Sequence, residues 1–130
     1  MKRQFIAAAV LSAILISAPN AHGHHSFAAE FQADATGTIS GVVTQVWFKN
    51  PHARYYVDVV DEDGNTTSWD TRANSPSLLV RKGWTKNSIN VGDQVTIHGY
   101  LGRDGRKLMS IITVTFADGR VLRDKQEEPK

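Results

Sequence analysis

The sequence has no cysteine among its 130 residues. Disulfide bonds, cysteine nucleophiles and lipid attachment through cysteine are therefore excluded. It also lacks a G-x-S-x-G nucleophile elbow, a phosphate-binding glycine loop and an H-E-x-x-H zinc motif. Most acidic residues lie in turn-forming stretches, where their ordinary role is solvated turn chemistry. Because no catalytic constellation stands out, we expect that the protein is not an enzyme.

An excess of positive charge is also missing once the first residues are set aside. Without Lys2 and Arg3, the remaining 13 basic residues balance the 13 acidic ones. Proteins that bind nucleic acids carry a basic surface that neutralises phosphates. We therefore expect no nucleic-acid partner.

No apolar run is long enough to span a bilayer, which takes ~20 residues. The longest run, Phe5 to Ile16, follows Lys2-Arg3 and precedes a stretch of small residues. A charged start, an apolar centre and a small-residue end are typical of a secretory signal peptide. We expect residues 1–23 to be that peptide, the protein to be periplasmic or secreted, and no stable membrane anchor to remain.

Two cleavage positions fit the small residues at the end of this peptide. Cleavage after Gly23 makes His24 the first residue of the mature chain, and cleavage after Ala21 makes it His22. About 107 residues follow Gly23, which is enough for one small domain with one core.

The mature chain alternates runs of β-branched and aromatic residues with turn residues, which is typical of strands. A corner at Lys49-Asn50-Pro51-His52 separates the first two strands, because Pro51 cannot donate a ladder hydrogen bond. The predicted strands are Thr36 to Phe48, Ala53 to Val60, Thr66 to Thr71, Gln94 to Leu101 and Leu108 to Phe116, with a short final strand at Val121-Leu122.

One helix is predicted between the third and fourth strands. Ser75 suits its N-cap, Pro76 its first position and Gly83 its end, and Leu78, Leu79 and Trp84 could cover one open end of a barrel. This order predicts an all-β fold: a small five-stranded OB-like barrel over residues 24–123 with one short capping helix. A two-sheet sandwich is the alternative. We expect the charged residues 124–130 to form a flexible C-terminal tail.

Five histidines carry the clearest hint of chemistry. His22, His24 and His25 lie at the mature start, His52 at the corner and His98 on the fourth strand. Neutral imidazole is the commonest metal ligand in proteins. The α-amine and ring of an N-terminal histidine can chelate one ion, and a second histidine completes a tetragonal nitrogen set that suits Cu(II).

Aromatic residues suggest a second candidate site. Rings and an arginine on one face of an OB-type sheet form a common ligand platform. The residues of this platform would be Trp47, Asn50, Arg54, Tyr56 and Trp69. Packing in the core is the alternative explanation for these rings.

Several stretches together resemble a bacterial family of exported domains of unknown function. They are the start H-H-S-F-A-A-E-F, the corner W-F-K-N-P-H-A-R-Y-Y-V-D-V, then R-K-G-W, V-G-D-Q-V-T-I-H-G and V-T-F-A-D-G-R. The resemblance implies a small periplasmic β-barrel, and the matching histidines are His24, His25 and His52.

We therefore expect a periplasmic barrel that binds a copper ion through the His24 terminus, His52 and His25. Such a protein would carry, store or deliver the ion to an envelope protein. The alternative is a metal-free module that holds a partner protein or a small ligand on its aromatic face.

Overall fold

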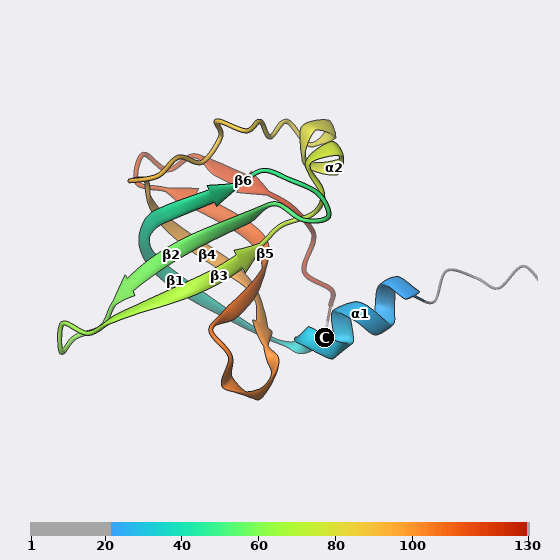
Figure 1. Cartoon of the computed structure of the whole chain (residues 1–130), viewed down its shortest axis with the longest axis horizontal. Coiled ribbons are helices and arrows are strands. Elements are labelled where there is room, and N and C mark those ends of the chain that lie inside the picture. Colours follow the sequence, from blue (N-terminus) through green and yellow to red (C-terminus); the bar gives the residue numbers. More distant parts are fainter. Residues whose placement is uncertain (1–21, 130) are drawn as a thin grey trace, which may run out of the picture.

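The computed structural model describes residues 22–129, with side chains from Ser26 onward. The strands form one curved sheet that closes into a barrel (Figure 1). In chain order the elements are helix α1 (His22–Glu30), strand β1 (Phe31–Trp47), β2 (Arg54–Val60), β3 (Thr66–Arg72), helix α2 (Pro76–Arg81), β4 (Gln94–Gly102), the 3₁₀ turn η1 (Arg103–Gly105), β5 (Leu108–Phe116) and β6 (Val121–Arg123).

Strand β1 pairs antiparallel with both β2 and β4, and β2–β3, β4–β5 and β5–β6 are also antiparallel. The ring closes where β3 runs parallel to β5 and Asp70–Arg72 lie opposite Leu108–Ser110. Five strands in this order, with α2 between β3 and β4, confirm the predicted OB-like barrel. The short β6 extends the sheet beyond β5.

The alternation of residues along the strands decides which side chains enter the core. Tyr55 and Val57 of β2 and Val95 and Ile97 of β4 are buried, while their neighbours in sequence face outward. Gly41 lets β2 approach β1, because a Cβ at this position would lie 2.1 Å from the carbonyl oxygen of Asp58. The register of the β1–β2 pair shifts soon after, between Val43 and Gln45.

Helix α2 begins and ends as predicted, with Ser75 at its N-cap and Pro76 next to it. Leu79 and Trp84 are buried in the main core cluster. Leu78 was predicted to cover the barrel end with them, but it is 43% exposed. In a helix of six residues, only one side can face the barrel, and Leu79 occupies that side.

Strand β1 begins at Phe31, five residues before the predicted Thr36. Its first residue pairs with Gly102, and the Gln32 side chain donates a hydrogen bond to the Gly102 carbonyl over 3.1 Å. Phe31 is buried in a second, smaller cluster with Phe27 and residues of β4 and β5. Because of these contacts with β4 and β5, β1 begins earlier in the sequence than predicted.

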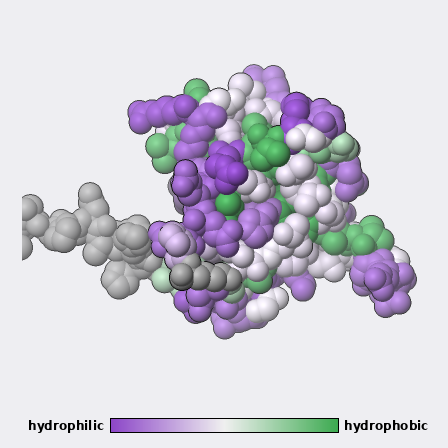
Figure 2. All heavy atoms as spheres, turned by 180° about the vertical axis from the view of Figure 1, so that it is seen from behind, coloured by the Kyte–Doolittle hydropathy of each residue, from purple (hydrophilic) through white to green (hydrophobic). Residues whose placement is uncertain are grey.

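Hydrophobic residues that remain exposed are spread over several elements. Figure 2 shows separate apolar patches among polar atoms on one face of the molecule. The large exposed members are Val42, Trp47, Val60, Leu78, Val80, Val91 and Val121. Within residues 22–129, no helix is both long enough and apolar enough to cross a membrane.

Replacing Tyr55 with phenylalanine is expected to stabilise the fold by about 1 kcal/mol. The Tyr55 hydroxyl is buried without a hydrogen-bond partner among the described residues, and such a group costs about 1–3 kcal/mol. Burial, and then the charge of Asp124, raises the pKa of Tyr55, so stability falls as the pH rises above about 10 and the variant escapes that loss. Urea unfolding at neutral and alkaline pH measures both effects.

Tyr100→Phe is the matched control for this change. The Tyr100 hydroxyl accepts a hydrogen bond from the Glu128 backbone N–H over 3.0 Å. Its removal is expected to destabilise the protein by about 1 kcal/mol. Equal effects of the two variants would show that the Tyr55 hydroxyl is satisfied in solution.

Candidate functional site

Helix α1 is attached to the side of the barrel through Phe27. The Phe27 ring stacks on Phe31, with 5.1 Å between ring centroids, and meets the edge of Tyr100 at 5.7 Å. The ammonium of Lys125 lies 6.0 Å from the centroid of the same ring. Phe27 and Phe31, four residues apart, thus fix α1 to the barrel.

Two arginines next to the β4–β5 turn bind the last turn of α1. Arg103 donates a hydrogen bond to the Ala28 carbonyl, and Arg106 donates one to the Glu30 carbonyl over 3.2 Å. The final carbonyls of a helix have no partner within the helix and carry partial negative charge, so cations are favoured there. These contacts hold the C-terminal end of α1 in place.

An ion-pair network joins α1 to strand β3. Both carboxylate oxygens of Glu30 accept hydrogen bonds from Arg72 over 2.9 Å, and Arg72 also binds Asp70 at 3.0 Å. Burial alone would lower the pKa of Arg72, but the hydrogen bonds to Asp70 and Glu30 raise it overall. Arg54 lies 3.5 Å from Asp70, so the positive charges of the two arginines are balanced by the negative charges of the two carboxylates.

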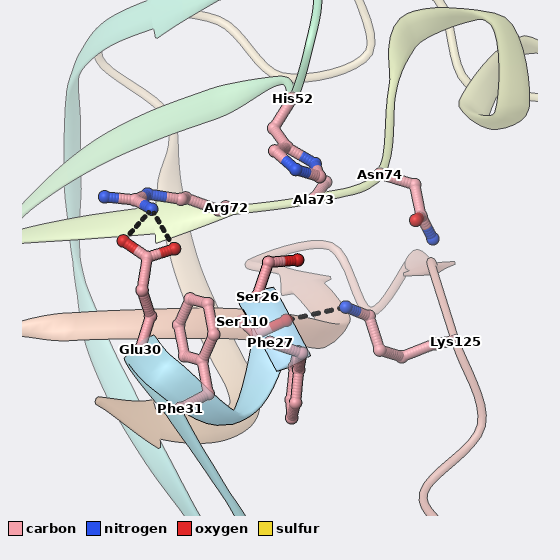
Figure 3. Close-up of a pocket in the computed structure, with 10 residues that line it drawn as sticks. All are labelled: Ser26, Phe27, Glu30, Phe31, His52, Arg72, Ala73, Asn74, Ser110 and Lys125. Atoms are coloured by element: carbon pink, nitrogen blue, oxygen red, sulfur yellow. Dashed lines mark hydrogen bonds and ion pairs between the residues drawn. The ribbon is translucent and has the colours of Figure 1, made fainter. Parts of the chain in front are cut away.

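A pocket of about 390 Å³ opens between α1 and the corner that precedes β2. Polar and charged side chains surround it on three sides, and phenylalanine rings form its floor (Figure 3). Its lining residues are Ser26, Phe27, Glu30, Phe31, His52, Arg72, Ala73, Asn74, Ser110 and Lys125.

Of the predicted metal ligands, only the side chain of His52 lies within the described part. It is exposed at the corner and, like the Ser26 hydroxyl, faces the pocket (Figure 3). The side chains of His24 and His25 lie outside the described residues, although the α1 backbone includes both. Among the side chains that are described, no three of histidine, aspartate and glutamate come together as a metal site.

His98, the remaining histidine beyond α1, is engaged elsewhere. Its Nδ1 lies 3.1 Å from the Thr38 hydroxyl and its Nε2 lies 3.0 Å from the Glu127 carboxylate. It sits on the outward side of β4, as its place between Ile97 and Gly99 predicts, and it does not line the pocket.

The predicted aromatic platform is only partly assembled. Trp47 pairs with Arg54 across β1 and β2, and Tyr56 lies on the same outward face. Asn50 is exposed at the corner nearby. Trp69 pairs with the buried Val57 and packs against the core, so it lies on the opposite face of the sheet.

The far wall of the pocket is formed by residues that the sequence pattern does not reveal as part of a site. Asp124 is 1% exposed and binds the Asn74 backbone N–H at 3.0 Å, although we predicted a flexible tail from this residue onward. Lys125 follows and donates a hydrogen bond to the Ser110 hydroxyl over 2.6 Å. Beyond them, Glu127 accepts a hydrogen bond from Thr36, so the segment is attached by polar contacts that hydropathy does not reveal.

Comparison with known proteins gives a family and no activity. No curated protein matches the chain in sequence. One family covers residues 12–110, a stretch that runs from before α1 to the start of β5 and includes the corner and His52. The chain therefore belongs to DUF6152, a family of unknown function.

Proposed function

We propose that the protein is an exported copper-binding barrel whose ligands are the N-terminal histidine segment and His52. The observation that carries this proposal is that His52 and Ser26 line one pocket. Ser26 directly follows His25 in helix α1. Because a helix rises 1.5 Å per residue, His24 lies only about 3 Å further along the axis.

The anchoring of α1 supports this placement. The barrel binds the Phe27 ring, the Glu30 side chain and the carbonyls of Ala28 and Glu30, all within the five residues that follow His25. A terminus that begins at His24 would start close to the corner, and its α-amine would have no partner within the helix. The amine can then ligate a metal without breaking a helical hydrogen bond.

The donor set favours copper over other divalent ions. The amine and the imidazoles are all nitrogen donors. A tetragonal arrangement of nitrogen donors suits Cu(II). The positive end of the helix dipole opposes a cation there by about 0.3–1 kcal/mol, which is small beside the gain expected from several coordinate bonds. A terminus at His22 would give His22-Gly23-His24, a different nitrogen set for the same ion.

The role we propose is binding and handing on, without catalysis. The leader-like residues 1–23 support export to the periplasm or beyond, where an envelope protein would be the recipient. The formal charge of the mature chain is zero, which argues against a nucleic-acid partner.

Isothermal titration of the protein that begins at His24 with Cu(II) tests the proposal. We expect one tight site per chain, and electron paramagnetic resonance should show nitrogen ligands. Acetylating the α-amine is expected to weaken binding at least about a hundredfold, and His52→Ala about tenfold, because each removes a ligand.

His98→Ala is the matched control, since His98 binds Thr38 and Glu127 away from the pocket. Its copper affinity should equal that of the unchanged protein. If the acetylated protein or His52→Ala binds copper as tightly as the unchanged protein, the proposed ligand set is wrong.

The second candidate function is a metal-free binding module. The shared outward face of Trp47, Arg54 and Tyr56 favours it, because these side chains could hold a partner protein or a small ligand. The inward position of Trp69 leaves this platform with two rings instead of three. A protein that stays empty in the copper titration would favour this function.

A further inference from the structure

The far wall of the pocket presents a cation in fixed orientation. Lys125 follows β6, its side chain is 25% exposed, and its ammonium is 2.6 Å from the Ser110 hydroxyl. A carboxylate oxygen of Asp124 lies 3.7 Å from the same ammonium. Figure 3 shows the ammonium at the edge of the open space, across from Arg72.

Charges near this wall do not balance among the described residues. Lys82 lies 3.3 Å from Asp124, so two ammonium groups share a single carboxylate. On the opposite wall, Arg54 and Arg72 are matched by Asp70 and Glu30. Glu128 does not line this pocket, although it lines the neighbouring pocket of about 330 Å³ together with Lys125. Among the described residues, Asp124 is thus the one carboxylate that forms an ion pair with either lysine, so it does not fully neutralise Lys125.

Burial makes the charge of Lys125 costly. Burial lowers the pKa of Lys125. The charge of Asp124 raises this pKa in part, and the charge of Lys82 lowers it further. A bound anion would offset the desolvation of the ammonium. The Ser110 side chain belongs to a residue that is only 4% exposed, and Asp124 favours the protonated amine. Lys125 and Ser110 are thus suited to hold an anion. They are poorly suited to act as base and nucleophile.

The rest of the pocket is suited to a short apolar body. Phe27, Phe31 and Ala73 supply apolar surface, and Asn74 and His52 can add hydrogen bonds at the rim. Pockets for small molecules have volumes of roughly 300–1,000 Å³ and combine apolar walls with a few polar groups. A volume of about 390 Å³ suits a small ligand.

We propose that this pocket binds a small organic carboxylate, whose charged end contacts Lys125 and whose apolar body lies against Phe27 and Phe31. Binding needs neither copper nor the N-terminal amine. The inference thus goes beyond the copper proposal and stands or falls separately from it.

Titration of metal-free protein with 3-phenylpropionate, followed by amide NMR, tests the proposal, with neutral 3-phenylpropanamide as the chemical control. We expect shifts at Asn74, Ser110 and Lys125, and an affinity for the carboxylate about tenfold above that for the amide. Lys125→Gln should remove this preference. Lys82→Gln, which leaves Asp124 to Lys125 alone, should reduce it about threefold.

Lys86→Gln is the matched control, since Lys86 is exposed and does not line the pocket. It should bind the carboxylate like the unchanged protein. The dispersion of the amide spectrum reports whether each variant is folded, and Lys82→Gln provides a second test if Lys125→Gln is not. Equal binding of carboxylate and amide, no binding of either, or full affinity in a folded Lys125→Gln protein would overturn the proposal.

Discussion

Asp124→Ala is expected to lower the free energy of unfolding by about 3 kcal/mol, because it removes a buried carboxylate that several polar groups share as their partner. The Asp124 carboxylate accepts hydrogen bonds from the Asn74 backbone N–H at 3.0 Å and from the Asn74 side chain at 2.8 Å. It also forms ion pairs with Lys82 and Lys125. Breaking a buried ion pair by removing one member costs roughly 3–5 kcal/mol.

The lower end of that range applies because both lysines keep some contact with water. The Lys82 side chain is 38% exposed and the Lys125 side chain is 25% exposed, so part of each charge can be solvated. Urea unfolding measures the loss. Asp124→Asn should lose less, since an amide oxygen can still accept a hydrogen bond from Asn74.

Asp118→Ala serves as the control for the loss of a carboxylate. Asp118 lies on the surface and pairs with Arg120 over 2.8 Å, with more than half of each side chain exposed. Exposed pairs contribute little, so the unfolding midpoint should stay the same. If Asp124→Ala were as harmless as this control, residues 124–128 would not be bound to the barrel in solution.

Gly41→Ala is expected to cost about 3 kcal/mol, the upper end for overpacking. The new Cβ would lie 2.1 Å from the Asp58 carbonyl oxygen and 2.8 Å from its carbon. These are backbone atoms, so no side-chain rotation relieves the clash. Strands β1 and β2 would have to separate where Val42 pairs with Asp58. Urea unfolding and thermal unfolding both measure this loss.

Gly37→Ala is the matched control on the same strand. Its Cβ would lie 2.9 Å from a terminal carbon of Leu101, and no backbone atom is among its three nearest neighbours. Because Leu101 is only partly buried, its side chain can move aside at a cost below about 1 kcal/mol. Similar losses in the two variants would mean that the β1–β2 approach at Gly41 is looser than the structure indicates.

Local chemistry made most of the fold predictable. The alternation of Tyr55 and Val57 with polar neighbours fixes the inner face of β2. Ser75 and Pro76 mark the start of α2. The beginning of β1 could not be predicted in the same way, because Phe31 joins the strand by pairing with Gly102, far away in sequence.

The candidate site was predictable only at the corner. Pro51 and the surrounding strand residues place His52 at an exposed turn between two strands. The opposite wall depends on where residues 124–128 lie, and their sequence is charged and without apolar anchors. Four polar contacts hold the buried Asp124 in place, and contacts of this kind produce no periodic pattern in the sequence.

The residues that hold α1 all come later in the chain than α1 itself. Its contacts reach Arg72, Tyr100, Arg103, Arg106 and Lys125. A chain that is synthesised from its N-terminal end exposes α1 long before these contacts can form. Docking of α1 onto the barrel would therefore come last, after the C-terminal half has been made.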